Sequence, residues 1–273
     1  MIKTKTLKSG VRIVMEEMPS VQSAAIGIWI KAGAVDENLK NSGVSHFIEH
    51  MMFKGTENRS SREIASDIDK IGGQINAFTG KEGTAYYVKS LYNNIFKSAD
   101  VLVDMLSNSK FETKEMNKER KVIFEEINMS LDSPEDVAHE AISELVFKGN
   151  PLGKSIIGTR SSLNRITRNV LIDYYENEYS RDNMVIAITG KFDEQAVCEY
   201  FDDKFLDLKA KKPTKDIEIL PYKKSYKVIV KDIEQTHICL ATKGLKLDDD
   251  RRYAFAILNN IMGGSMSSRL FQN

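Results

Sequence analysis

The stretch Asn41-Ser42-Gly43-Val44-Ser45-His46-Phe47-Ile48-Glu49-His50-Met51-Met52-Phe53 has the clearest helical period of the chain. Its apolar side chains recur at spacings of three and four residues, which predicts a helix with one buried stripe. The members of that stripe are Val44, Phe47, Ile48, Met51 and Met52. Because this stripe packs the helix against a core, the remaining polar face is expected in a cleft or at the surface.

The polar face of this helix carries two histidines and a glutamate. His46 and His50 are four residues apart, so on a helix they lie one turn apart on the same face. Two imidazoles in that arrangement can bind one metal ion. Glu49 lies in the same arc, where its carboxylate could take a proton from metal-bound water. For the motif alone, two helix-face histidines beside a solvated glutamate remain an alternative.

A second glutamate-rich helix is predicted over 112–129, and it offers candidates for a third metal ligand. Zinc sites that perform hydrolysis usually have three protein ligands and leave the fourth position for water. Glu119 and Glu126 share a helix face, whereas Glu125 points about 100° away from Glu126. Spacing alone favours a solvated charged helix here, because Glu119 can pair with neighbouring basic residues along the surface.

The other hydrophobic patterns interleave strands and helices without a regular βαβ rhythm. Strands are expected over 11–16, 23–31, 74–79, 84–88 and 184–190. Further helices are expected over 60–71, 94–107, 134–147 and 168–179. This order predicts the α+β class, with a mixed or antiparallel sheet and helices packed on it.

A lysine-rich segment with Pro213 and Pro221 predicts a domain boundary. We expect a first domain over 1–208, a linker over 209–221 and the beginning of a second domain over 222–273. In the second domain, strands are predicted over 226–230 and 237–242, and a helix from about 248 to 262. Overlaying Ile238 on Ile26 repeats the order strand, turn and helix, which hints that the second domain resembles the first.

Composition excludes several classes of protein. The 273 residues carry 39 basic and 39 acidic side chains, and this zero net charge disfavours a nucleic-acid binder. No apolar run reaches the length that spans a bilayer, so no membrane association is expected. The two cysteines, Cys198 and Cys239, form no disulfide framework, and no secretory signal opens the sequence. A cytoplasmic location is expected.

Several segments, in this order along the chain, together resemble the insulinase and pitrilysin type of zinc peptidase. They are 46–56, 76–79 with 84–87, 119–127, 151–159 and 262–271. The first contains the inverted His-x-x-Glu-His motif, which is a signature of these enzymes. The resemblance covers essentially the whole chain and is closest to bacterial relatives of the β subunit of the mitochondrial processing peptidase. It implies an α/β-roll domain followed by the start of a second, non-metal-binding half.

The resemblance implies a zinc-dependent endopeptidase that hydrolyses flexible or unfolded peptides and holds one Zn²⁺ per chain. His46, His50 and Glu126 would then be the zinc ligands. Glu49 would be the general base, and Glu119 a supporting carboxylate behind the metal. A homodimer or a partner subunit would be consistent with the family.

The same resemblance implies that Asn76, Ala77 and Phe78 lie on an edge strand that receives the substrate backbone. An arginine and a tyrosine that complete the family's substrate site come after its Ser267-Ser268-Arg269-Leu270 signature, so these 273 residues alone are expected to be a slow peptidase. Two alternatives remain: a catalytically silent core or partner subunit of the same fold, and a zinc hydrolase that acts on other substrates.

Overall fold

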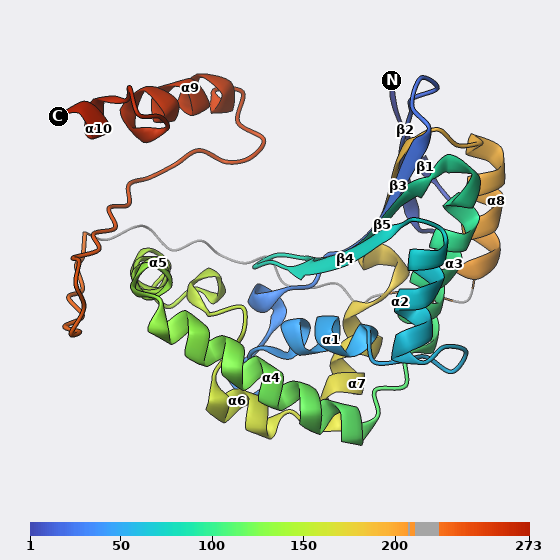
Figure 1. The fold of residues 1–273 in the computed structure, drawn as a ribbon, viewed down its shortest axis with the longest axis horizontal. Helices are drawn as coiled ribbons and strands as arrows, with labels where there is room; N and C mark the ends of the chain where they lie inside the picture. Colours follow the sequence, from blue (N-terminus) through green and yellow to red (C-terminus); the bar gives the residue numbers. More distant parts are fainter. Residues whose placement is uncertain (207, 211–223) are drawn as a thin grey trace.

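The computed structural model describes residues 1–206, 208–210 and 224–273. Residues 1–206 build a six-stranded mixed sheet with helices packed against it (Figure 1). The predicted α+β class is therefore confirmed.

The sheet ends in a strand whose outer side is open. The strands are β1 (Ile2–Thr6), β2 (Arg12–Glu17), β3 (Ser23–Ile30), β4 (Gln74–Thr79), β5 (Thr84–Leu91) and β6 (Met184–Gly190). Their order is β1-β2-β6-β3-β5-β4, and only β2 and β6 run parallel. β4 pairs with β5 from Gln74 opposite Lys89 to Thr79 opposite Thr84. Within the described residues no strand pairs with its other side.

Among the described residues, the first eight helices pack on the sheet or on one another, and the last two contact each other. The helices are α1 (Val44–Met52), α2 (Ser61–Lys70), α3 (Ile95–Asn108), α4 (Thr113–Asp132), α5 (Pro134–Val146), α6 (Arg160–Arg165), α7 (Arg168–Glu178), α8 (Glu194–Lys204), α9 (Arg252–Gly263) and α10 (Arg269–Gln272). α3 packs on β3 and β5, and α8 packs on β2. α1 contacts both β4 and α4, and it lies between them (Figure 1).

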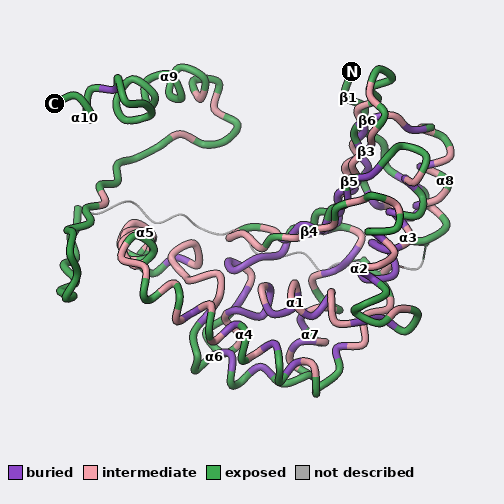
Figure 2. The backbone as a smooth tube through the Cα atoms, in the orientation of Figure 1, coloured by how far each residue is buried: buried purple, intermediate pink, exposed green. Residues whose placement is uncertain are grey.

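The burial of α1 confirms the predicted apolar stripe. Val44, Phe47, Ile48 and Met52 are fully buried, and Met51 is 1% exposed. Figure 2 shows α1 as one of the most deeply buried segments of the chain. Since its apolar face fills the core below the sheet, the helix turns its histidines toward β4 and α4.

Residues 224–273 differ from the prediction. The expected strands over 226–230 and 237–242 are wrong, because the chain there is extended but pairs with no strand in the described residues. α9 forms within the predicted range but has no buried residue, and this part of the chain is almost entirely exposed (Figure 2). The predicted linker over 209–221 lies largely outside the described residues, so the domain division stays a prediction.

Among the described residues, no helix combines the length and the apolar character needed to cross a membrane.

Candidate metal centre

The start of α1 is fixed by a buried carboxylate. Glu37 is 4% exposed, and its two oxygens accept hydrogen bonds from the backbone N–H groups of Gly43 (2.7 Å) and Ser45 (2.9 Å). Gly43 has a φ of 90°, and a Cβ there would lie 2.8 Å from the carbonyl oxygen of Ile157. Glu37 thus satisfies N–H groups that a helix start leaves unpaired, next to the positive end of the helix dipole.

α1 and α4 bring three potential metal ligands together. Oε2 of Glu126 lies 3.7 Å from Nε2 of His46, and Oε1 of Glu126 lies 3.5 Å from Nε2 of His50. One ligand atom from each of the three residues lies within 4.8 Å of the others. Ligand atoms around a tetrahedral zinc ion lie about 3.3 Å apart, so this donor set fits zinc.

The neighbouring Glu125 does not join this cluster. Its side chain is exposed and accepts a hydrogen bond from Nδ2 of Asn128. The geometry therefore separates the two adjacent glutamates, as the helical spacing predicted.

The neutral ring of His46 and the orientation of the His50 ring also suit a metal. Burial and the neighbouring His50 lower the pKa of His46 to about 4, so its imidazole is neutral at pH 7. Nδ1 of His50 contacts Oε2 of Glu119 at 3.2 Å, which leaves Nε2 facing Glu126. Metal-bound histidines usually contact a carboxylate through the other ring nitrogen. Nδ1 of His46, by contrast, is buried and has no hydrogen-bond partner within the described residues.

Glu49 lies beside the cluster and contacts the edge strand. Its Oε2 accepts a hydrogen bond from Oγ1 of Thr79 at 2.5 Å. Burial raises the pKa of Glu49, while the Thr79 hydroxyl and His50 lower it and Glu126 raises it. The net result is a pKa above the usual value of this carboxyl group. A general base works best when its pKa lies near the pH at which the enzyme acts. Thr79 belongs to a predicted strand but was not among the predicted site residues, because its contact joins that strand to a helix.

A cavity of about 500 Å³ opens in front of these residues. Its lining includes His46, Glu49, Ala77, Phe78, Thr79, Glu126, Ser130, Asp136 and Glu140. Two of the three predicted substrate residues, Ala77 and Phe78, thus share a cavity with the metal cluster. Asn76 lies on β4 outside that lining and accepts a hydrogen bond from the backbone N–H of Ala77.

Asp136 and Glu140 add two carboxylates to this cavity that the sequence reasoning missed. They are four residues apart in α5, so they share one face of a helix that the sequence did predict. That spacing was a usable signal.

Two family models match successive parts of the chain. The family described as insulinase (peptidase family M16) matches residues 12–160, and the M16 inactive domain matches residues 165–273. The second match begins before β6, which lies between β2 and β3 in the same sheet.

Several bacterial proteins described as uncharacterized zinc proteases are similar to this chain. YmxG of Bacillus subtilis is 41% identical over 273 residues, which are 100% of this chain and 66% of that protein. SCO5738 of Streptomyces coelicolor is 37% identical over 99% of this chain and 61% of that protein. The chain therefore spans a little under two thirds of the length of these relatives.

Solved structures share the fold. A protease from Helicobacter pylori has a TM-score of 0.84 and 23% identity, over 100% of this chain and 68% of that one. An M16 inactive domain from Pseudomonas fluorescens has a TM-score of 0.86 and 17% identity, over 100% of this chain and 67% of that one. With a family match over more than half of its length, the chain belongs to the insulinase family, peptidase family M16.

Proposed function

We propose that this chain carries the zinc centre of a metalloendopeptidase that hydrolyses flexible or unfolded peptides. The observation that supports this most strongly is the cluster of His46, His50 and Glu126, with Glu49 beside it, in a cavity bordered by an open strand edge. The relatives named as zinc proteases agree with a zinc-dependent hydrolase.

In this proposal each residue of the centre has one role. His46, His50 and Glu126 would hold a single Zn²⁺, which would supply a Lewis acid that polarises the scissile carbonyl and lowers the pKa of water toward about 7. Glu49, whose carboxylate lies beside the cluster, would take up a proton from the attacking water and pass it to the leaving amine. Glu119 orients His50 through Nδ1.

The two edges of the sheet support substrate binding at β4. The edge strand β1 carries Lys3 and Lys5, and charged side chains of this kind discourage pairing with another chain. β4 has the sequence Gln-Ile-Asn-Ala-Phe-Thr, without a charged residue. An extended peptide can therefore add to β4 through backbone hydrogen bonds. This mode of binding recognises the peptide backbone more than its side chains.

The charge of the cavity suggests a preference among peptides. The charge of a bound Zn²⁺ would offset Glu126 and Glu49, which leaves the carboxylates of Asp136 and Glu140, and the described lining residues include no lysine or arginine. Peptides with a basic side chain near the cleaved bond should therefore bind better than acidic ones.

The decisive experiment separates metal binding from proton transfer. The Glu49→Gln variant should keep zinc, because Glu49 is not a ligand, and should cleave unfolded peptides about 10²–10⁴-fold more slowly. Zinc content and cleavage of a mixed peptide library are measured on parent and variant. Equal cleavage rates would contradict the role of Glu49.

The silent partner subunit stays as the second candidate. A protein extended to the length of the relatives that binds zinc but cleaves no peptide would favour it over the peptidase, because the 273-residue chain alone is expected to be slow. A cytoplasmic location, action as a processing peptidase, and a homodimer or partner subunit stay predictions.

A further inference from the structure

A lysine lies next to the metal centre but is not among the residues that line its cavity. Nζ of Lys54 lies 2.7 Å from Oε1 of Glu119, and Oε2 of the same carboxylate lies 3.2 Å from Nδ1 of His50. The two oxygens of Glu119 are thus divided between one cation and one ligand histidine. The Glu119 side chain is 8% exposed, and that of Lys54 is 30% exposed.

We propose that Lys54 is a positioning residue of the metal centre, because it fixes the carboxylate that orients His50. This inference rests on the proposed zinc function. A carboxylate that is held at only one oxygen can rotate about its side-chain bonds. The ammonium of Lys54 holds the other oxygen, so that Glu119 presents Oε2 to Nδ1 of His50 in one orientation.

The backbone that carries Lys54 is itself anchored. Asp104 of α3 is 4% exposed and accepts hydrogen bonds from Oγ1 of Thr56 (2.6 Å), Nδ2 of Asn58 (2.6 Å) and Nη1 of Arg59 (2.8 Å). All three donors lie in the loop between α1 and α2, residues 53–60, which also carries Lys54. The loop backbone also bonds to the end of α3, since the N–H of Glu57 donates to the carbonyl of Asn108.

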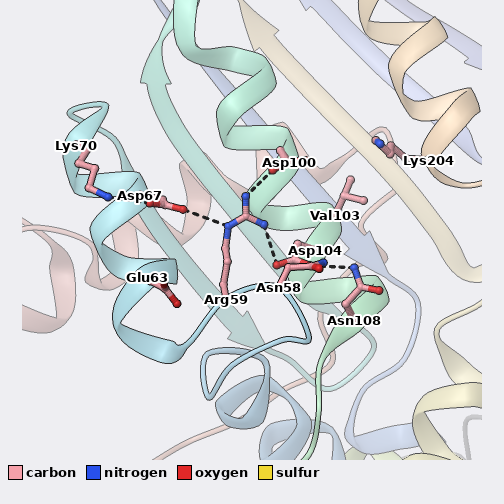
Figure 3. A pocket seen from close by; sticks show the side chains of 10 residues that line it. All are labelled: Asn58, Arg59, Glu63, Asp67, Lys70, Asp100, Val103, Asp104, Asn108 and Lys204. Atoms are coloured by element: carbon pink, nitrogen blue, oxygen red, sulfur yellow. Dashed lines mark hydrogen bonds and ion pairs between the residues drawn. The ribbon is translucent and has the colours of Figure 1, made fainter.

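Arg59 extends this anchor to both neighbouring helices. Figure 3 shows its guanidinium between Asp67 of α2 and Asp100 and Asp104 of α3. The pocket drawn there is therefore lined by a structural ion network. This network holds the loop that carries Lys54 in place before zinc binds. Precise ligand geometry requires such preorganisation.

Helix α4, which carries Glu119, also contains a second lysine–glutamate pair that serves as a matched control. Nζ of Lys118 lies 2.7 Å from Oε1 of Glu115 in α4, the same distance as in the Lys54–Glu119 pair. The Lys118 side chain is 58% exposed, and within the described residues no hydrogen bond or ion pair joins this pair to His46, His50 or Glu126. An ordinary surface ion pair of this kind contributes little.

The test compares Lys54→Met, Lys54→Arg and Lys118→Met with the parent chain. The zinc dissociation constant is measured by competition with a chelator, and the unfolding midpoint of each zinc-free protein is measured separately. Lys54→Met should weaken zinc binding about 10–100-fold, as substitutions of outer-shell partners typically do. Lys54→Arg should restore most of the affinity, and Lys118→Met should leave it unchanged.

Other results would overturn the inference. Parent-like zinc affinity in Lys54→Met, or equal losses in Lys54→Met and Lys118→Met, would show that Lys54 does not position His50. The inference would also be overturned if the unfolding midpoint of zinc-free Lys54→Met falls while its folded fraction binds zinc with the affinity of the parent. If the parent itself binds no zinc, the proposed function fails with it. A zinc-binding parent with an indifferent Lys54 leaves that function standing.

Discussion

Glu126 and Glu125 are adjacent in sequence, yet the helix turns them to different surroundings. Glu126 lies 3.5 Å from His50 and 3.7 Å from His46, while Glu125 is exposed and bonds to Asn128. The Glu126→Ala variant should therefore lose more than the roughly 100-fold in zinc affinity that an outer-shell substitution costs. Glu125→Ala should bind zinc like the parent. Zinc content after dialysis checks both, and equal occupancy in the two variants would refute the assignment of Glu126.

Thr79 connects the edge strand with the general base. Its hydroxyl donates to Oε2 of Glu49, and both residues line the cavity. Thr79→Val removes this donor at nearly constant volume, so kcat should fall about 10–100-fold, as expected for one hydrogen bond to a charged group. Zinc affinity should stay unchanged, and Thr79→Ser should restore kcat. A Thr79→Val enzyme with parent kcat, or a Thr79→Ser enzyme as slow as it, would contradict this role.

The sequence predicts those contacts of the site that join residues close together in one helix. The helical period alone brings His46, Glu49 and His50 to one face, because they lie within two turns of one helix. Spacing alone favoured a solvated helix for Glu119 and Glu126, and only the family resemblance pointed to a ligand. Contacts that join different elements, such as those of Lys54 and Thr79, have no local signature.

Among the elements, α1 depends on the carboxylate of Glu37 at its start. Burial raises the pKa of Glu37 to about 7, although the N–H groups of Gly43 and Ser45 lower it. In the unfolded chain this group titrates near 4.5. A raised pKa in the folded state means that its contribution to stability is full below about pH 4.5 and is lost as the pH rises to about 7.

The expected loss is up to about 3 kcal/mol in the free energy of unfolding. Chemical denaturation of the zinc-free protein across this pH range measures it. The Glu37→Gln variant does not titrate at this position and serves as the reference. If the difference between parent and variant stays constant from pH 4.5 to 7, Glu37 ionises in the folded state as it does in water.

The prediction of strands from the sequence fails where pairing with a neighbouring strand decides whether a strand forms. β1 has the polar sequence Ile-Lys-Thr-Lys-Thr and is exposed along its length, so only its pairing with β2 makes it a strand. The segment 226–230 is apolar except for Lys227 and has good strand propensity, yet no described strand pairs with it. Strand formation depends on neighbours that local sequence cannot specify.

On the scale of the molecule, the metal centre and the core lie in the same part of the chain. The buried core extends from Leu7 to Phe205, whereas α9 buries nothing. Lys227 reaches back to Glu144, but both side chains are largely exposed, and such pairs contribute about 0–1 kcal/mol.

A chain that ends at Leu208 should therefore fold and bind zinc like the longer one. Its zinc dissociation constant and unfolding midpoint, measured beside those of the 273-residue chain, check this. A large drop in either would show that residues beyond 208 help to build the centre. Such a drop would also move the proposed domain boundary.

The uncharged outer edge of β4 also has a colloidal consequence. An edge that accepts any extended backbone does not distinguish a substrate from a second copy of the protein. The net charge is zero, and the isoelectric point is about 6.9, so molecules near neutral pH do not repel one another at long range. Activity per molecule should therefore fall as the protein is concentrated near pH 7, in step with a rise in light scattering. Constant specific activity in a sample that associates would show that copies meet elsewhere.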